Sequence, residues 1–169
     1  MRESLKEFKR KYKDNPVYAL ESGVCAGKNA KKIYDNLNIT RLYLIDWYNS
    51  EYSDEVSGWL QSTHKAFDGK REVSLIIGET IATLNSISFP RKIDYIYIDD
   101  THSPEHVFKE MEILYPVVAK GGMLAGHDYV EGNGRAEKAV KDFCVKYKLK
   151  YQYKKNASED VCDWWIWKA

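Results

Sequence analysis

The sequence predicts an α/β protein with a doubly wound, mostly parallel sheet covered by helices. Short apolar runs alternate with segments of helical periodicity, which is typical of repeated strand–helix units. The length of 169 residues suits one core, and no repeat, low-complexity tract or linker rich in proline and glycine divides the chain. We therefore expect a single domain over residues 1–169, with an N-terminal helix from residues 1–15 packed on it.

The first half of the chain predicts a lone helix followed by three strand–helix pairs. The lone helix, at about 4–12, is basic and amphipathic, and we expect it at the edge of the sheet. The expected strands are Val17–Leu20, Arg41–Asp46 and Val73–Ile77, and the expected helices after them are Gly27–Asn36, Asp54–Phe67 and Glu79–Ile87.

The second half opens with Ile93–Asp99, a strand apolar enough to be central and covered on both faces. Ser103 and Pro104 then predict a helix start, because serine is a good N-cap and proline suits the first helical turn. We expect the apolar stripe of this helix to reach Val118 and Lys120-Gly121-Gly122 to break it. The remaining expected elements are strand Met123–Ala125, helix Arg135–Tyr147 and the closing strands Tyr151–Tyr153 and Trp164–Trp167.

Composition argues against several functional classes. The 26 basic and 25 acidic residues leave a net charge of +1, which gives no broad field for a phosphate backbone, so we expect no nucleic-acid partner. No apolar run approaches the roughly 18 residues of a membrane helix, so we expect no membrane partner. The three cysteines form no CxxC pair, which favours a reducing compartment and a cytoplasmic protein.

Polar residues gather where the predicted strands end. In open parallel sheets, ligands bind at the carboxyl ends of the strands, near the point where strand order reverses. The residues at these ends are Glu21 to Gly27, Asp46-Trp47, Gly78-Glu79, Asp99 to His102 and Gly126 to Tyr129. This concentration of carboxylates and histidines predicts a ligand site at one edge of the sheet.

The loop from Glu21 to Gly27 admits several interpretations. It is one residue short of a phosphate-binding loop, and Asn29 stands where that motif needs a hydroxyl. Cys25 replaces the middle glycine of a dinucleotide fingerprint. An acidic residue, two spaced glycines and a helix suit a ligand with an ammonium and a carboxylate, such as the methionyl part of S-adenosylmethionine. A tight turn without a ligand remains the alternative.

Asp46 ends the second strand about 25 residues after Glu21. A carboxylate in this position can accept hydrogen bonds from both hydroxyls of a ribose. Trp47 could stack on an adenine, and Gly78-Glu79 would form the second wall of an adenine pocket. The alternative is a helix-capping aspartate beside a half-buried tryptophan.

Four blocks in order resemble class I S-adenosylmethionine-dependent methyltransferases. The blocks are Glu21-Ser-Gly-Val-Cys-Ala-Gly27, Leu44-Ile-Asp46-Trp47, Ile96-Tyr-Ile-Asp99-Asp-Thr-His102-Ser103 and Gly121-Gly-Met-Leu-Ala-Gly-His127-Asp128-Tyr129. The last two are closest to a subgroup of bacterial and phage enzymes, some of which act on sugar hydroxyls. This subgroup is similar to the macrolide and cephalosporin-cluster O-methyltransferases. The resemblance covers about residues 17–143. It implies a three-layer Rossmann-like fold with a seven-stranded sheet and an antiparallel closing strand. It also implies S-adenosylmethionine as cofactor and a hydroxyl of a small molecule or sugar as methyl acceptor.

The resemblance also implies residue roles for the cofactor. Glu21, Gly23 and Gly27 would border its methionyl part, Asp46 would hold its ribose, and Asp99 would lie near its sulfonium.

The same resemblance bears on the proton acceptor and on a metal ion. In metal-dependent relatives, the aspartates that match Asp99 and Asp128 bind Mg²⁺, and the residue two after the first is often the general base. Here that residue is Thr101, which cannot act as a base. His102 or His127 would then take the role, with or without Mg²⁺.

Other interpretations stay open. A nicotinamide-dependent oxidoreductase would share the fold, although the GxGxxG motif is missing. A ligand-binding domain without activity would explain Thr101. A homo-oligomer could complete the acceptor site, because the chain shows no separate substrate domain. His64 and His106 fall on predicted helices, and we expect both to be structural.

Overall fold

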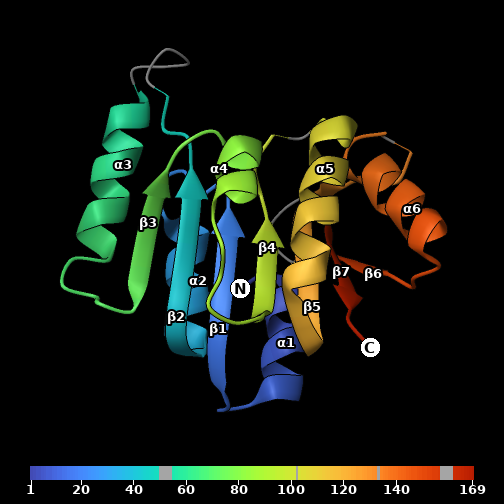
Figure 1. Ribbon diagram of the computed structural model, residues 1–169, viewed down its shortest axis with the longest axis horizontal. Helices are drawn as coiled ribbons and strands as arrows, with labels where there is room; N and C mark the ends of the chain where they lie inside the picture. Colours follow the sequence, from blue (N-terminus) through green and yellow to red (C-terminus); the bar gives the residue numbers. More distant parts are fainter. Residues whose placement is uncertain (50–54, 102, 133, 157–161) are drawn as a thin grey trace.

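The computed structural model describes residues 1–49, 55–101, 103–132, 134–156 and 162–169. Its sheet has the strand order β3-β2-β1-β4-β5-β7-β6 (Figure 1). The strands are β1 (Pro16–Ser22), β2 (Asn38–Asp46), β3 (Val73–Ile77), β4 (Ile93–Ile98), β5 (Val118–Tyr129), β6 (Gln152–Lys155) and β7 (Cys162–Trp167). Neighbouring strands pair in parallel, except that β7 runs antiparallel to β5 and to β6. The predicted doubly wound sheet with an antiparallel closing strand is confirmed.

Helices cover both faces of this sheet (Figure 1). On one face lie α1 (Glu3–Tyr12), α2 (Lys28–Asn36) and α3 (Glu55–Ala66), and on the other lie α4 (Thr80–Ser86), α5 (Pro104–Leu114) and α6 (Ala136–Tyr147). A separate cluster of buried apolar side chains fills the space under each helical layer. The three-layer architecture is therefore confirmed. Among the described residues, no helix has the length and apolar character needed to cross a membrane.

The connection from α5 to β5 differs from the prediction. The helix ends at Leu114 and is followed by a 3₁₀ turn over Tyr115–Val117, so its extension to Val118 was wrong. Pro116 explains the early end, because proline has no N–H to donate and its ring clashes with the preceding helical turn. The predicted break at Lys120–Gly122 lies inside β5, where a Cβ on Gly122 would come within 2.7 Å of the Asp94 carbonyl oxygen.

The sequence predicts helix α1 at the edge of the sheet, but the helix lies across one face. Leu5 and Phe8 are fully buried, and the Phe8 ring packs against Tyr95 and Trp167 with centroid distances of 4.9 and 6.1 Å. Apolar packing of this kind contributes roughly 1.5–3 kcal/mol for each large side chain that is fully buried. The amphipathic pattern was interpreted correctly, but it carried no information on where the helix would dock.

A buried carboxylate fixes the start of α1. Asp163 of β7 has no exposed surface and accepts hydrogen bonds from the backbone N–H and the hydroxyl of Ser4, at 3.0 and 2.7 Å. It also accepts from the Tyr97 hydroxyl at 3.0 Å and from the Asn156 amide at 2.9 Å. The four bonds tie the N-terminal segment to β4 and β7 and thereby limit where the residue before α1 can point.

Replacing Asp163 with alanine should therefore destabilise the fold. We expect Asp163→Ala to lower the free energy of unfolding by about 3 kcal/mol, because three buried polar side chains lose a shared acceptor. Urea denaturation measures this loss. Asp142→Ala, on the exposed side of α6, is the matched control, and an equal loss in both variants would contradict the prediction.

Candidate active site

The strand register brings the predicted site residues to one level. Ser22 of β1 pairs with Ile45 of β2 and with Ile98 of β4, and Ile98 in turn pairs with Gly126 of β5. The next residues along these four strands are Gly23, Asp46, Asp99 and His127. Parallel strands end at a common edge, so the backbone itself gathers these side chains.

Two adjoining hollows open at this edge. The first, about 520 Å³, is lined by Arg2, Glu21, Asn29, Asp99, His127 and Asp128, among others, and we call it the β5-side hollow. The second, about 490 Å³, is lined by Asp46, Trp47, Glu79, Asp100 and His106, among others, and we call it the β2-side hollow. Gly23, Cys25, Trp59 and Asp99 line both, so the two form one groove. A concave site of this size suits a small ligand.

The glycines of the first loop are required by its shape. Gly23 has φ +77°, and a Cβ there would lie 2.2 Å from the carbonyl oxygen of Asp99. Gly27 has φ +74°, caps α2, and would bring a Cβ within 3.0 Å of the Thr63 hydroxyl. Gly23 lines the groove, whereas Gly27 is not among the residues that line either hollow. Gly27 shapes the turn, and its place beside the methionyl part of the cofactor stays a prediction.

Asp46 braces the same loop. One of its carboxylate oxygens accepts hydrogen bonds from the backbone N–H groups of Val24 and Cys25, at 2.7 and 2.8 Å. The other accepts from the N–H of Tyr48 at 2.9 Å. A carboxylate has about four acceptor positions, so about one remains for an added ligand.

Glu21 and Asn29 line the β5-side hollow, and each carries a hydrogen-bond acceptor without a partner in the described part of the chain. The Asn29 amide donates to one oxygen of Glu21 at 3.0 Å. The Glu21 Oε2 and Asn29 Oδ1 atoms are buried and have no hydrogen-bond partner among the described residues. Burial raises the pKa of Glu21 well above its usual range, because the charged form lacks solvent. Two buried acceptors side by side fit a positively charged donor such as an ammonium.

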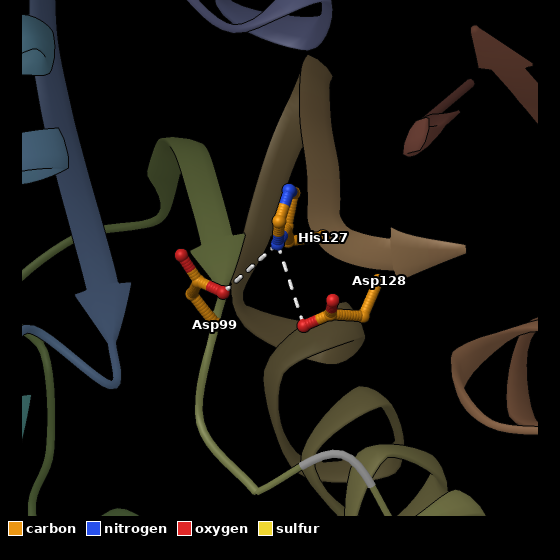
Figure 2. Close-up of side chains that lie close together, drawn as sticks. All are labelled: Asp99, His127 and Asp128. Atoms are coloured by element: carbon orange, nitrogen blue, oxygen red, sulfur yellow. Dashed lines mark ion pairs between the residues drawn. The ribbon is translucent and has the colours of Figure 1, made fainter. Parts of the chain in front are cut away.

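Asp99, His127 and Asp128 form a compact cluster (Figure 2). The Nδ1 atom of His127 lies 3.5 Å from an Asp99 oxygen and 3.3 Å from an Asp128 oxygen. Asp128 has φ +56°, and the pairing of β5 with β7 shifts register between Gly126 and Tyr129. A bulge at this point changes the direction of a side chain, and here it turns the Asp128 carboxylate toward the His127 nitrogen that Asp99 also faces.

Arg2 completes the cluster from the far end of the sequence. Its Nη1 atom contacts His127 Nε2, and its Nη2 atom lies 3.6 Å from an Asp99 oxygen. The Arg2 side chain is only 13% exposed. No sequence signal marked this residue, since it precedes the first helix and lies 125 positions from His127.

Burial and the neighbouring carboxylates shift the pKa of His127 in opposite directions. Burial lowers the pKa of the ring, but hydrogen bonds to Asp128 and Asp99 outweigh burial and raise that pKa to about 10. A charged ring, however, could not accept a hydrogen bond at Nε2, and a guanidinium can only donate. The Arg2 contact therefore requires the neutral ring, with the lone pair on Nε2.

With this geometry in place, the comparisons identify the family. Residues 20–129, more than half of the chain, match the family of methyltransferase domains. The chain belongs to this family. No curated protein sequence gives a significant match.

Solved structures agree with this assignment. A Streptococcus mutans protein described as a methyltransferase, in complex with S-adenosylhomocysteine, is 16% identical, with 96% of this chain and 94% of that chain covered and a TM-score of 0.71. An O-methyltransferase from Bacillus cereus, also with S-adenosylhomocysteine, is 14% identical, with 98% of this chain and 79% of that chain covered and a TM-score of 0.71. An rRNA methylase from Streptococcus thermophilus is 13% identical, with 96% of this chain and 92% of that chain covered and a TM-score of 0.69. The methyltransferase therefore has the Rossmann-like fold of these structures, and the fold leaves its methyl acceptor open.

The remaining predicted site residues of the methyltransferase differ in placement. Glu79 caps α4 by accepting from the N–H groups of Ile81 and Ala82, at 3.2 and 2.7 Å, and also lines the β2-side hollow. Trp47 lines the same hollow and is 44% exposed. His102 lies outside the described residues, so its catalytic role stays a prediction.

A second charged cluster in the methyltransferase joins α5 to the end of β4. His106 Nε2 lies 3.0 Å from an Asp100 oxygen and 3.2 Å from an oxygen of the buried Glu110. The hydrogen bonds with Asp100 and Glu110 raise the pKa of His106 to about 10, against the effect of burial. His106 thus joins two elements, as expected of a structural residue, and also lines the β2-side hollow.

The Asp100–His106–Glu110 cluster should make the stability of the methyltransferase depend on pH. The pKa of His106 is raised in the folded state, so its stabilising effect is complete below the unfolded value of 6.5 and is lost as pH rises through about 10. We expect His106→Gln to lower the free energy of unfolding at pH 6 and to approach wild type near pH 10. Urea titrations across this range measure the difference. His64→Gln, on exposed helix α3, is the control, and a pH-independent difference for His106→Gln would contradict the assignment.

Proposed function

We propose that this methyltransferase transfers a methyl group from S-adenosylmethionine to a hydroxyl of a small molecule or sugar. The observation that carries the proposal is the Asp99–His127–Asp128 cluster, which lines the same hollow as Glu21. A hydroxyl must lose its proton as its oxygen gains a methyl group, and an imidazole supported by carboxylates is suited to accept that proton near neutral pH. The Bacillus cereus O-methyltransferase is similar in fold.

The groove offers complementary groups for the cofactor. Glu21 and Asn29 would hold the methionyl ammonium, since both residues line the β5-side hollow and each has a buried acceptor without a partner among the residues that the structure describes. Asp46 would use its remaining acceptor capacity for the ribose, and Trp47 and Glu79 lie on the adenine side. When bound, S-adenosylmethionine supplies an electrophilic methyl group on a sulfonium.

The protein's own part in the reaction is to hold the acceptor and move a proton. The Nε2 atom of His127 is the ring nitrogen turned away from the two carboxylates, so it would accept the hydroxyl proton. Asp99 and Asp128 would then stabilise the positive charge that forms on the ring. Holding the hydroxyl in line with the methyl group supplies much of the remaining rate enhancement.

The other interpretations are weaker on these observations. Membership of the methyltransferase family argues against a nicotinamide-dependent oxidoreductase. One structural neighbour is an rRNA methylase, but the near balance of charge in this chain supports a small acceptor over RNA. The assays described below test whether the domain has methyltransferase activity.

Cofactor binding tests the groove. We expect Glu21→Gln and Asp46→Ala each to weaken S-adenosylhomocysteine binding about 10-fold or more. Asp46→Ala removes charged hydrogen bonds worth about 1.5–3 kcal/mol, and Glu21→Gln removes the carboxylate whose ionised form the bound ammonium would stabilise. Isothermal titration calorimetry measures the affinities. Asp35→Asn, on the exposed side of α2, should bind like wild type. Wild-type affinity in both site variants would remove the cofactor assignment.

Turnover tests the acceptor class. The protein is incubated with S-adenosylmethionine and a panel of sugars and small hydroxyl compounds, and methylated products are identified by mass spectrometry. We expect O-methylation, with kcat about 100-fold lower in Asp128→Asn and His127→Gln, because general-base catalysis contributes about 10²–10⁴-fold. S-adenosylhomocysteine affinity should stay within about 3-fold of wild type. Methylation of RNA or of nitrogen alone would contradict the proposal.

A further inference from the structure

The Asp99–His127–Asp128 cluster has the spacing of a metal site but not the donor set that Mg²⁺ prefers. One ligand atom from each residue lies within 4.8 Å of the others. Mg²⁺ favours an octahedron of oxygen atoms. Here an imidazole nitrogen lies between the two carboxylates, at 3.5 and 3.3 Å, where the ion would have to sit. Mg²⁺ therefore does not fit the cluster as it is built, although the resemblance predicts Asp99 and Asp128 as its ligands.

Arg2 determines which nitrogen of His127 carries the proton. A guanidinium has only donors, so Nε2 of His127 must accept from Arg2 through its lone pair. The proton of the neutral ring then resides on Nδ1, the atom that faces both carboxylates. A protonated nitrogen cannot bind a metal ion. The contact with Arg2 thus turns a set of three ligands into a hydrogen-bonded triad.

Arg2 also supplies the positive charge that a metal ion would bring. Its guanidinium lies 3.6 Å from Asp99, and the two side chains are 13% and 18% exposed. Arginine stays charged in proteins, and at this distance and burial the attraction to a carboxylate is only partly screened. A divalent ion placed in the cluster would be repelled by the same charge.

The fold holds Arg2 in this position. The next residue, Glu3, donates its backbone N–H to the buried Asn156 at 3.2 Å, and Ser4 is bound to Asp163 through its backbone and its hydroxyl. Leu5 follows and is fully buried. Three consecutive residues after Arg2 are therefore fixed, so its side chain is delivered to the cluster by the packing of α1.

We propose that Arg2 is the resident cation of the Asp99–His127–Asp128 cluster and that the centre works with this arginine in place of a divalent metal ion. This inference rests on the proposed assignment of the cluster to the reacting centre. The tautomer that Arg2 imposes is also the one the reaction needs, because an acceptor hydroxyl can replace Arg2 at Nε2 and pass its proton there. Arg2 is thus a positioning residue that keeps His127 ready as a base.

Binding of Mn²⁺ alone, followed by electron paramagnetic resonance of the free ion, tests the proposal without any acceptor. We expect wild type to bind no Mn²⁺ at this cluster and Arg2→Met to bind about one ion, because methionine removes both the positive charge and the donor that keeps the proton on Nδ1. The double variant Arg2→Met/Asp128→Asn should lose this ion. Arg2→Lys, which keeps the charge, and Arg10→Met, on the exposed side of α1, should bind no Mn²⁺ at the cluster.

Three results would overturn the proposal. The first is a Mn²⁺ ion in wild type that Asp128→Asn removes, and the second is no gain of binding in Arg2→Met. The third is loss of wild-type turnover in the presence of EDTA. Thermal melting shows whether each variant is folded. Failure of the proposed hydroxyl methylation would appear in the product assay alone, because the Mn²⁺ measurement depends on neither cofactor nor acceptor.

Discussion

The common register of β2, β1, β4 and β5 is the constraint on which the rest of the site depends. The last residues paired across these four strands are followed directly by Gly23, Asp46, Asp99 and His127. A shift of one strand by one residue would therefore move one of these four out of the groove. The close approach of Gly23 to the Asp99 backbone secures the β1–β4 contact at this level, because any side chain at Gly23 would collide with it. The pairing of the strands in the sheet therefore determines the geometry of the site more than the conformation of any loop does.

The outer strands and the N-terminal helix add the chemistry to this framework. Trp164 of β7 donates its indole N–H to the carbonyl oxygen of His127 at 3.1 Å, and its ring packs on Gly126 where a Cβ would be only 2.5 Å away. This contact stabilises the bulge that turns Asp128 inward. Asp163, the preceding residue of the same strand, binds the start of α1 and so places Arg2 on the opposite side of the His127 ring. One antiparallel strand thus supports both sides of the cluster.

Much of this could be predicted from the sequence, for reasons that are local. Alternation of apolar strands and amphipathic helices predicts the fold class, and β3 was predicted with its observed bounds. The residues after each strand could be assigned to one edge because parallel strands share that edge. The end of α5 was missed because the apolar stripe was given more weight than Pro116. Arg2 could not be found, since its placement depends on the long-range contacts between Ser4 and Asp163.

The central claim is that the ends of four strands form one pocket for the adenosyl and methionyl parts of the cofactor. A crystal structure of the protein with S-adenosylhomocysteine tests it most directly. We expect the amino group of the ligand within hydrogen-bonding distance of Glu21 and Asn29 and its adenosine in the β2-side hollow. A ligand bound away from the groove, or one whose amino group contacts neither residue, would contradict it.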